Sequence, residues 1–365
     1  MSTPSLPEEQ NALLITAKGA RMTVGKRLVP KPGAGQVIVN NIAVAINPVD
    51  VYIQKFGLFV KDEDLPAVCG NDASGEVCAL GEDVQGWSIG DKVLYNCHMA
   101  NDRYTFQEYT LVDAARMALV PSSITFEQAA TIPLCLGVAS IGIYERKDDA
   151  LRPDGFDRGG AGLTPPWAPG GSGKYAGQAA LVVGGASSVG QFALQLLKAS
   201  GFSPLITTAS SHNEEYCKAA GATHVVDYNV TPYERLPGAV KSIVGDTPVG
   251  FVFDAVAHGG IQIPAFSILA PGGGMVTVVP PEVGKRAEDD EQGRRVVWVF
   301  GGVNEEEHKE FGKELYGRLT GMIEDGVIKP NRVRVLDGGL GAIPSGCDEL
   351  EKGVSGIKLV VRVRD

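Results

Sequence analysis

The sequence of 365 residues lacks an excess of basic residues, a dense group of cysteines and a long apolar run. Its 33 Lys and Arg against 43 Asp and Glu give a net charge of −10, which argues against a nucleic-acid partner because phosphate binding needs clustered positive charge. No apolar run approaches the roughly 20 residues that cross a bilayer, and the N-terminus is polar and acidic. We therefore expect a cytoplasmic protein that contacts neither membrane nor nucleic acid.

Patterns typical of metal sites and hydrolases are also missing. The six cysteines are spread along the chain without a CxxC pair, so we expect neither a disulfide framework nor a structural zinc knot. A G-x-S-x-G nucleophile motif is absent, which argues against a hydrolase. The histidines show no metal-ligand spacing and are interpreted as surface or core residues: His98, His212, His224, His258 and His308.

Glycine is the residue in excess, with 47 of 365, or about 13%, against an average of roughly 7%. The first ~140 residues are rich in short strand patterns such as Val37-Ile38-Val39, closely punctuated by Gly, Pro and Asp. From Ala179 onward, short apolar runs alternate with helical patterns, which predicts a parallel sheet covered on both faces. The length agrees with two domains.

Between these halves, residues 152–177 contain 8 Gly and 4 Pro. No periodic segment survives there, so we interpret the stretch as a long surface loop or flexible insertion without chemistry of its own. Near the C-terminus, residues 305–324 predict a charged helix, and the run from Ile357 to Val363 predicts a strand that completes a sheet.

One glycine-rich turn carries the strongest chemical signal. It follows a predicted strand, opens a predicted helix and reads Val182-Val183-Gly184-Gly185-Ala186-Ser187-Ser188-Val189-Gly190. Small residues let the backbone approach a pyrophosphate, and the free N–H groups of a helix start bind it, so the turn predicts a dinucleotide site. Ser187 replaces the middle glycine of the usual pattern and could donate to a phosphate oxygen. The alternative is an ordinary tight turn between strand and helix.

The choice of nicotinamide cofactor depends on the end of the second strand, where an acid would hold the 2′-hydroxyl of NAD. Residues 207–213 contain small hydroxyl and amide side chains and no acid, which favours the 2′-phosphate of NADP(H) over NADH. No Arg or Lys clamps that phosphate, and Ser211 with Glu214 also matches a helix capping box.

Several segments together resemble the medium-chain dehydrogenase/reductase superfamily. Besides the glycine turn they are Ile46-Asn47-Pro48-Val49-Asp50-Val51-Tyr52-Ile53, Gly70-Asn71-Asp72-Ala73-Ser74-Gly75-Glu76-Val77 and Gly90-Asp91-Lys92-Val93. The resemblance covers nearly the whole chain. It is strongest to the zinc-independent quinone oxidoreductases and the fungal trans-acting enoyl reductases of the lovastatin-pathway type, which Ser355-Gly356-Ile357-Lys358-Leu359-Val360-Val361 and the insertion also fit.

The resemblance implies an α/β fold with two domains. A discontinuous GroES-like, β-rich catalytic domain is expected at residues 1–142 and 300–365. A Rossmann NADP-binding domain with a doubly wound parallel sheet is expected at residues 143–299, with the insertion at 152–177. The active site is expected in the cleft between them.

The same resemblance implies that no metal is bound. Zinc-dependent relatives place a cysteine where this chain has Asn47 and a His-Glu pair where it has Asn71-Asp72, and only Cys97 lies where a four-cysteine lobe would follow. Asparagine and proline cannot replace thiolate and imidazole as zinc ligands. Cys135 lies within about one residue of the third ligand register, but one ligand does not make a site.

By resemblance, Asn47 and Tyr52 are the catalytic candidates, because that segment lies beside the nicotinamide. Tyr52 could donate to a substrate carbonyl or relay a proton; the alternative is a packed ring. Gln54 and Val138 stand where quinone reductases usually carry Arg and Thr. Both departures argue against quinone reduction by this chain. The cofactor-binding residues implied are Asn47, Pro48, Asp50, Val138, Gly184, Ser187, Ser188, Val189, Gly190, Ser210, His212, Tyr228, Val256, Val278, Val279 and Ser355.

The expected function is NADPH-dependent reduction of the C=C bond of an α,β-unsaturated carbonyl or enoyl thioester without metal. The alternatives are an NADPH:quinone oxidoreductase and a non-catalytic, cofactor-binding accessory protein. The partner is a small enone, enal or acyl thioester, with a polyketide synthase carrier domain as a further candidate. The substrate itself stays open, because its pocket is built from separated stretches of chain.

Overall fold

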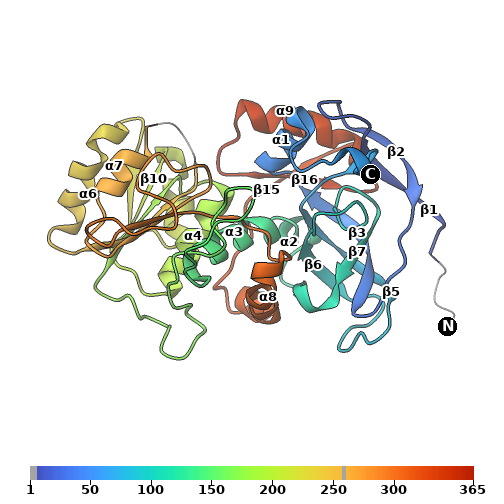
Figure 1. The fold of residues 1–365 in the computed structure, drawn as a ribbon, viewed down its shortest axis with the longest axis horizontal. Coiled ribbons are helices and arrows are strands. Elements are labelled where there is room, and N and C mark those ends of the chain that lie inside the picture. The colour runs from blue at the N-terminus through green and yellow to red at the C-terminus, as the bar shows by residue number, and fades with distance from the viewer. Residues whose placement is uncertain (1–5, 257–259) are drawn as a thin grey trace.

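The protein consists of a mostly β half and a parallel α/β half that lie side by side (Figure 1). The computed structural model describes residues 6–256 and 260–365, so His258 lies outside the described residues. Helix α3 (Pro133–Tyr144) lies between the halves, where it packs against α4 (Ser188–Ala199) of the α/β half and β6 (Lys92–Asn96) of the β half. The expected fold class, a GroES-like domain with a Rossmann domain, is confirmed.

A seven-stranded sheet forms the centre of the β half. Its order is β15-β16-β3-β5-β6-β8, with β7 paired to β3. Strand β16 (Lys358–Arg362) runs antiparallel to β3 (Gln36–Ala45), with Val360 opposite Ala45, so the predicted C-terminal strand is confirmed. The other strands of this sheet are β5 (Asp72–Leu80), β7 (Tyr109–Asp113), β8 (Met117–Leu119) and β15 (Val333–Leu336). A smaller sheet has the order β2 (Thr23–Leu28), β1 (Glu9–Ile15) and β4 (Ala67–Val68).

The α/β half contains a parallel sheet of six strands in the order β11-β10-β9-β12-β13-β14. They span β9 (Ala179–Val183), β10 (Leu205–Ala209), β11 (His224–Asp227), β12 (Val249–Asp254), β13 (Gly274–Thr277) and β14 (Arg295–Trp298). The sequence does not predict strand β14, because its four residues follow a charged stretch at 285–295.

Helices cover both faces of this sheet, which explains its unalternated apolar strands. Ala180 and Val182 of β9 pack with α3 and α4, whereas Leu181 and Val183 pack with α6 and α7 on the opposite face. The remaining helices are α1 (Pro48–Phe56), α2 (Phe126–Ala129), α5 (Glu214–Ala220), α6 (Leu236–Val244), α7 (Gln262–Ser267), α8 (Lys309–Glu324) and α9 (Ile343–Lys352). Helix α8 confirms the charged helix expected at residues 305–324. The domain boundaries at 142 and 300 remain predictions.

The insertion at 152–177 contains no helix or strand, which agrees with the predicted long surface loop, but Asp157 ties it to the sheet edge. The Asp157 carboxylate accepts from the backbone N–H of Trp298 at 2.7 Å, and the Asp157 N–H donates to the Trp298 carbonyl at 3.1 Å. Asp157 therefore covers part of the open edge of β14. Gly159 and Gly160 lie so close to α3 that a Cβ on either would come within 2.0 Å of the Arg146 or Ile141 carbonyl oxygen. Glycine at these two positions therefore allows close packing.

One stretch is long and apolar enough to cross a membrane, against the expectation from sequence. It covers Phe126–Tyr144, which is α2 and α3, and 72% of it is buried inside the protein. This burial is what a core helix between two halves of a protein requires.

Candidate active site

The glycine turn between β9 and α4 has the close approach that a dinucleotide site needs. Gly184 has φ +77°, and a Cβ there would lie 2.1 Å from Cγ1 of Val256. A Cβ on Gly190 would lie 2.2 Å from the Gly184 carbonyl oxygen, so helix and turn touch through bare backbone. Both positions therefore require glycine, as the fingerprint does at its tight turn and helix contact.

Most backbone donors of this turn are already engaged. The hydroxyls of Thr208 and Thr207 accept from the N–H groups of Gly184 and Gly185 at 2.9 and 3.0 Å. Ser187 is the N-cap of α4, and its Oγ accepts from the Gly190 N–H at 3.0 Å. Because the first N–H groups of a helix have no partner within it, the amides of Ser188 and Val189 remain as anion donors. Gly184 and Gly190 shape the turn instead of binding an anion directly.

Ser355 from the C-terminal segment meets the residues that follow β10. Its Oγ lies 3.1 Å from Nε2 of His212 and accepts from the Asn213 side chain at 2.8 Å, and Ser210 lies 3.4 Å from His212. The structure thus brings three predicted cofactor-binding residues together, namely Ser210, His212 and Ser355. The Ser211–Glu214 capping box is not formed, because α5 follows a short turn, Ser211–Asn213, without a side-chain cap.

The neighbouring strand β11 brings an acid to this end. Asp227 accepts from the Ser211 N–H at 3.0 Å, and the hydrogen bonds from Asn229 and Ser211 lower its pKa against the opposing effect of burial. Tyr228, which follows it, is 39% exposed. Sequence reasoning inspected only the end of the second strand and missed this carboxylate.

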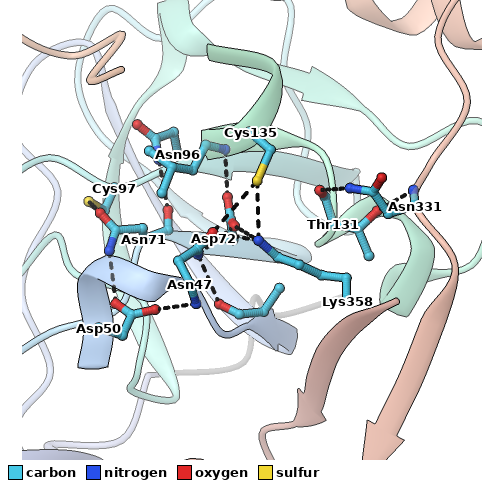
Figure 2. A network of polar contacts seen from close by, with 12 residues as sticks. Asn47, Asp50, Asn71, Asp72, Asn96, Cys97, Thr131, Cys135, Asn331 and Lys358 are labelled. Carbon is cyan, nitrogen blue, oxygen red and sulfur yellow. Dashed lines mark hydrogen bonds and ion pairs between the residues drawn. The ribbon is translucent and has the colours of Figure 1, made fainter. Parts of the chain in front are cut away.

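A buried polar cluster lies where α1 begins (Figure 2). We call Asn47, Asp72, Cys135 and Lys358 the Lys358 cluster. The Lys358 ammonium donates to the Asn47 amide oxygen and lies 3.3 Å from the Cys135 sulfur and 3.5 Å from Asp72 Oδ2. The amide nitrogen of Asn47 donates to the same Asp72 oxygen at 2.8 Å. Lys358 is only 4% exposed, so a complete ammonium group is buried with these three partners.

Asp50 supports this cluster from the first turn of α1. Its carboxylate accepts from the Asn47 N–H at 2.8 Å and from the Asn71 side chain at 2.9 Å, and the residue is fully buried. Asn71 in turn accepts from Cys97 Sγ at 3.2 Å. The prediction that Asp50 contacts the cofactor conflicts with this geometry. Asp50 instead holds the start of α1.

Burial is the largest single influence on the pKa of Lys358, Asp72 and Asp50. Burial lowers the pKa of Lys358, but Cys135 and Asp72 outweigh it, so the net shift is upward and the ammonium is retained. Burial raises the pKa of Asp72, and Lys358 and the Asn47 and Leu134 N–H donors oppose that shift. Burial also raises the pKa of Asp50 from 3.8 to about 7, against the hydrogen bond from Asn47.

Asp50→Asn should remove a pH dependence of stability. Because the pKa of Asp50 is raised on folding, its stabilising effect is complete below about pH 4 and is lost as the pH rises through about 7. The shift from 3.8 to about 7 corresponds to at most about 4 kcal/mol. Urea unfolding at pH 5 and pH 8 should show wild type losing stability relative to the variant. Asp246→Asn, at a fully exposed side chain, is the control, and parallel curves for wild type and Asp50→Asn would contradict this origin.

Tyr52 faces outward from α1 beside the cluster. Its side chain is 52% exposed, and its ring stacks on Phe56 at 6.2 Å between centroids, so the hydroxyl is available to a substrate. Gln54 points away from the cleft, since it is buried and accepts from the Met22 N–H at 3.4 Å. Val138 lies on α3 against Gly301, and three predicted lining residues follow the carboxyl ends of β12 and β13: Val256, Val278 and Val279.

An aromatic cluster joins the insertion to the loop after α1. The Phe156 ring lies 4.0 Å from Trp298 and 5.0 Å from Phe300, and Phe59 contacts Phe300 edge-on at 6.1 Å. The Arg152 guanidinium stacks on Phe300 at 4.1 Å. The insertion therefore reaches the segment that follows β14, next to the loop of the helix that carries Tyr52.

Lys358 is the residue of the Lys358 cluster that the sequence does not single out. The sequence predicts only that it belongs to a C-terminal strand. The signal was present, because a lysine between Ile357 and Leu359 in an otherwise apolar strand has to be paired if the strand is buried.

Two family models match the chain. The alcohol dehydrogenase GroES-like domain matches residues 33–122, and the zinc-binding dehydrogenase model matches residues 188–290. The first match lies in the β half and includes the Asn47 and Asp72 positions. The second begins at Ser188, the first residue of α4.

Curated fungal proteins are similar over most of the chain. The trans-enoyl reductase tndF of Aspergillus flavipes is 30% identical over 375 residues, covering 98% of this chain and 99% of that protein. The enoyl reductase component lovC of the lovastatin nonaketide synthase of Aspergillus terreus is 29% identical over 384 residues, covering 99% and 98%. The dehydrogenase pigH of Monascus ruber is 33% identical over 264 residues, which is 70% of this chain and 66% of that protein.

Solved structures share the fold over nearly the full length. The quinone oxidoreductase of Pseudomonas syringae superposes with a TM-score of 0.72 at 22% identity, covering 97% of this chain and 99% of that one. The CurK enoyl reductase superposes with a TM-score of 0.74 at 18% identity, covering 98% and 99%. At these identities the likeness concerns the fold alone.

Proposed function

Because this chain belongs to the medium-chain dehydrogenase/reductase superfamily, with fungal trans-enoyl reductases among its relatives, we propose that it reduces an activated C=C bond with NADPH and without metal. The substrate is an α,β-unsaturated carbonyl or an enoyl thioester. The observation that carries the proposal is the Lys358 cluster, where an ammonium group lies among Asn47, Asp72 and Cys135. A site without a Lewis acid is poorly suited to oxidising an alcohol, but it suits conjugate reduction.

The zinc named in the matched family does not fit these residues. The structure of residues 6–256 and 260–365 contains no group of three or more His, Cys, Asp or Glu side chains that could hold a metal ion. Cys135 already contacts the Lys358 ammonium, and the Asn47 amide is a poor ligand for zinc. Metal analysis of the purified protein should find far less than one zinc per chain, and about one tightly held zinc would contradict the proposal.

The cofactor site proposed here fits a dinucleotide. The close backbone approach at Gly184 and Gly190 and the free amides of Ser188 and Val189 suit a pyrophosphate. Bound NADPH would supply the hydride that the alkene accepts at its β-carbon. Asn47 is 1% exposed and its amide is held by Lys358 and Asp72, so it orients the nicotinamide end through the start of α1, which it fixes, together with Pro48. The adenosine end and the pocket walls are assigned to Ser187, Ser210, His212, Tyr228, Ser355, Val138, Val256, Val278 and Val279.

Tyr52 completes the proposed reaction. As the alkene accepts hydride at one carbon, negative charge develops on the conjugated carbonyl oxygen. A half-exposed tyrosine hydroxyl on a capped helix can donate a hydrogen bond to that oxygen. The hydroxyl stabilises the enolate, and a proton from Tyr52 or water then reaches the α-carbon.

NADPH is preferred to NADH in this proposal because small donors surround the adenosine end. Ser210 and His212 can donate to a 2′-phosphate. Asp227 works against this preference, since its carboxylate occupies the Ser211 amide at the same strand edge. NADH is therefore the alternative cofactor, and the ratio of kcat/KM for the two cofactors decides between them.

Three substrates separate the proposed function from its alternatives. NADPH consumption is measured with an enone, with an enoyl thioester and with a quinone. Turnover of the enone or thioester supports the proposal, whereas turnover of the quinone alone supports a quinone oxidoreductase. Tight NADPH binding without any turnover would indicate an accessory protein. A thioester on a polyketide synthase carrier domain, tested beside the free thioester, probes the carrier as partner. We place the reaction in the cytoplasm.

A further inference from the structure

The Lys358 cluster gathers side chains from four distant parts of the chain around one ammonium group. Asn47 precedes α1, Asp72 begins β5, Cys135 lies on α3 and Lys358 begins β16 (Figure 2). Asn47, Asp72 and Cys135 stand at or next to the positions where zinc-dependent relatives carry metal ligands. In this chain these side chains face a lysine nitrogen.

We propose that the Lys358 ammonium is the permanent cation of this site and acts as a positioning residue, which holds Asn47 and the start of α1 in place for catalysis. The inference rests on the proposed function, in which Asn47 orients the cofactor and Tyr52 meets the substrate. Lys358 itself touches neither substrate nor cofactor in this role. It acts through the Asn47 side chain.

Both ends of the Asn47 amide are specified by charged partners. Its oxygen accepts from Lys358, and its nitrogen donates to Asp72 Oδ2 at 2.8 Å. A flipped amide would place its oxygen against the carboxylate and its nitrogen against the ammonium, so only one orientation is compatible with this pair. The backbone N–H of Asn47 is bound in addition by Asp50. The cation and two carboxylates thus fix this residue completely.

This orientation is transmitted to Tyr52 through a short rigid helix. Helix α1 begins at Pro48, directly after Asn47, and Tyr52 lies five residues after Asn47. The backbone adds a second link, because the Ile46 N–H donates to the Leu359 carbonyl at 3.0 Å. A displacement of Lys358 therefore moves both the nicotinamide-side amide and the hydroxyl that faces the substrate.

Stability alone does not account for this buried ammonium. Removing two charges from water is costly, and a buried ion pair is often replaceable by apolar side chains without loss of stability. The same segment also carries Ser355, three residues before Lys358, which contacts His212 and Asn213 at the adenosine end. Residues 355–358 therefore connect the two ends of the proposed cofactor cleft.

The test separates charge neutralisation from positioning. Lys358→Met leaves Asp72 buried without its cation and should lower the melting temperature, whereas the double variant Lys358→Met/Asp72→Asn removes that charge and should recover it. If Lys358 positions Asn47, kcat stays roughly 10- to 100-fold below wild type in the double variant. The Kd for NADPH, measured by its fluorescence, changes by only a few fold. The single variant Asp72→Asn is measured as the matched control.

Recovery of kcat together with the melting temperature would overturn the proposal, because Lys358 would then only neutralise Asp72. If the methionine variants fail to fold, Lys358→Gln/Asp72→Asn replaces them, since glutamine keeps an N–H donor without charge. It should retain more turnover than Asp72→Asn combined with Lys358→Ala, and equal turnover would contradict positioning.

The outcome is distinguishable from failure of the proposed function. Activity is followed with whichever of the enone, enoyl thioester or quinone the wild type reduces. A wild type that reduces none of them contradicts the proposed function. The positioning proposal is then decided by the melting temperatures and by the emission of bound NADPH. That emission should differ from wild type in the double variant if the nicotinamide side has moved, and identical emission would overturn the proposal.

Discussion

Ser188→Asp is expected to abolish NADPH binding while the protein stays folded. Ser188 is the first residue of α4, and its amide is a free donor at the dinucleotide turn. A carboxylate placed there meets the pyrophosphate with like charge, which costs several kcal/mol, so the Kd for NADPH should rise by at least about 100-fold. The same carboxylate interacts favourably with the helix start and stabilises it by about 0.3–1 kcal/mol when no cofactor is bound.

The control for this variant is Ser188→Asn, which has similar size without charge. It should bind NADPH within a few fold of wild type. Binding is measured by fluorescence titration and folding by the melting temperature, which should be unchanged or slightly raised in Ser188→Asp. An unchanged affinity for NADPH in Ser188→Asp would contradict the whole placement of the cofactor.

Tyr52→Phe is expected to lower kcat by about 100-fold with little change in the Kd for NADPH. The hydroxyl is half-exposed and is proposed to bind the oxygen on which charge develops only in the transition state. Loss of one such donor typically costs 10²- to 10³-fold in kcat. Because the bond is weaker in the ground state, KM should change much less than kcat.

Tyr109→Phe is a matched control for the loss of a tyrosine hydroxyl. Tyr109 lies on β7, where its ring packs against Arg364. Steady-state kinetics with the enoyl thioester should give wild-type values for that variant. If Tyr52→Phe also gave wild-type kcat, Tyr52 would be a surface ring without a role in the reaction, and the proton donor would have to lie elsewhere.

Much of the dinucleotide half is readable from local pattern. A strand, a turn of small residues and an amphipathic helix follow one another at residues 179–199, and each is set by residues adjacent in the chain. Strand β14 was not readable, because four residues after a charged stretch carry little signal. The packing of the insertion was not readable either, because its composition resembles a flexible linker, yet Gly159 and Gly160 lie against the Arg146 and Ile141 carbonyl oxygens.

The sequence by itself determined the fold class, the family and the position of the glycine turn, because these depend on short-range periodicity and on residues that must be small. Only the tertiary structure decided which groups of the site face one another. It placed Thr207 and Thr208 on the turn amides, turned Asp50 inward and brought Lys358 from the last strand to Asn47. Asn47 and Lys358 are 311 residues apart, so no local pattern could have paired them. Two sets of glycines show the same division: Gly184 and Gly190 belong to a turn that local sequence specifies, whereas Gly159 and Gly160 allow close packing that only the assembled structure requires.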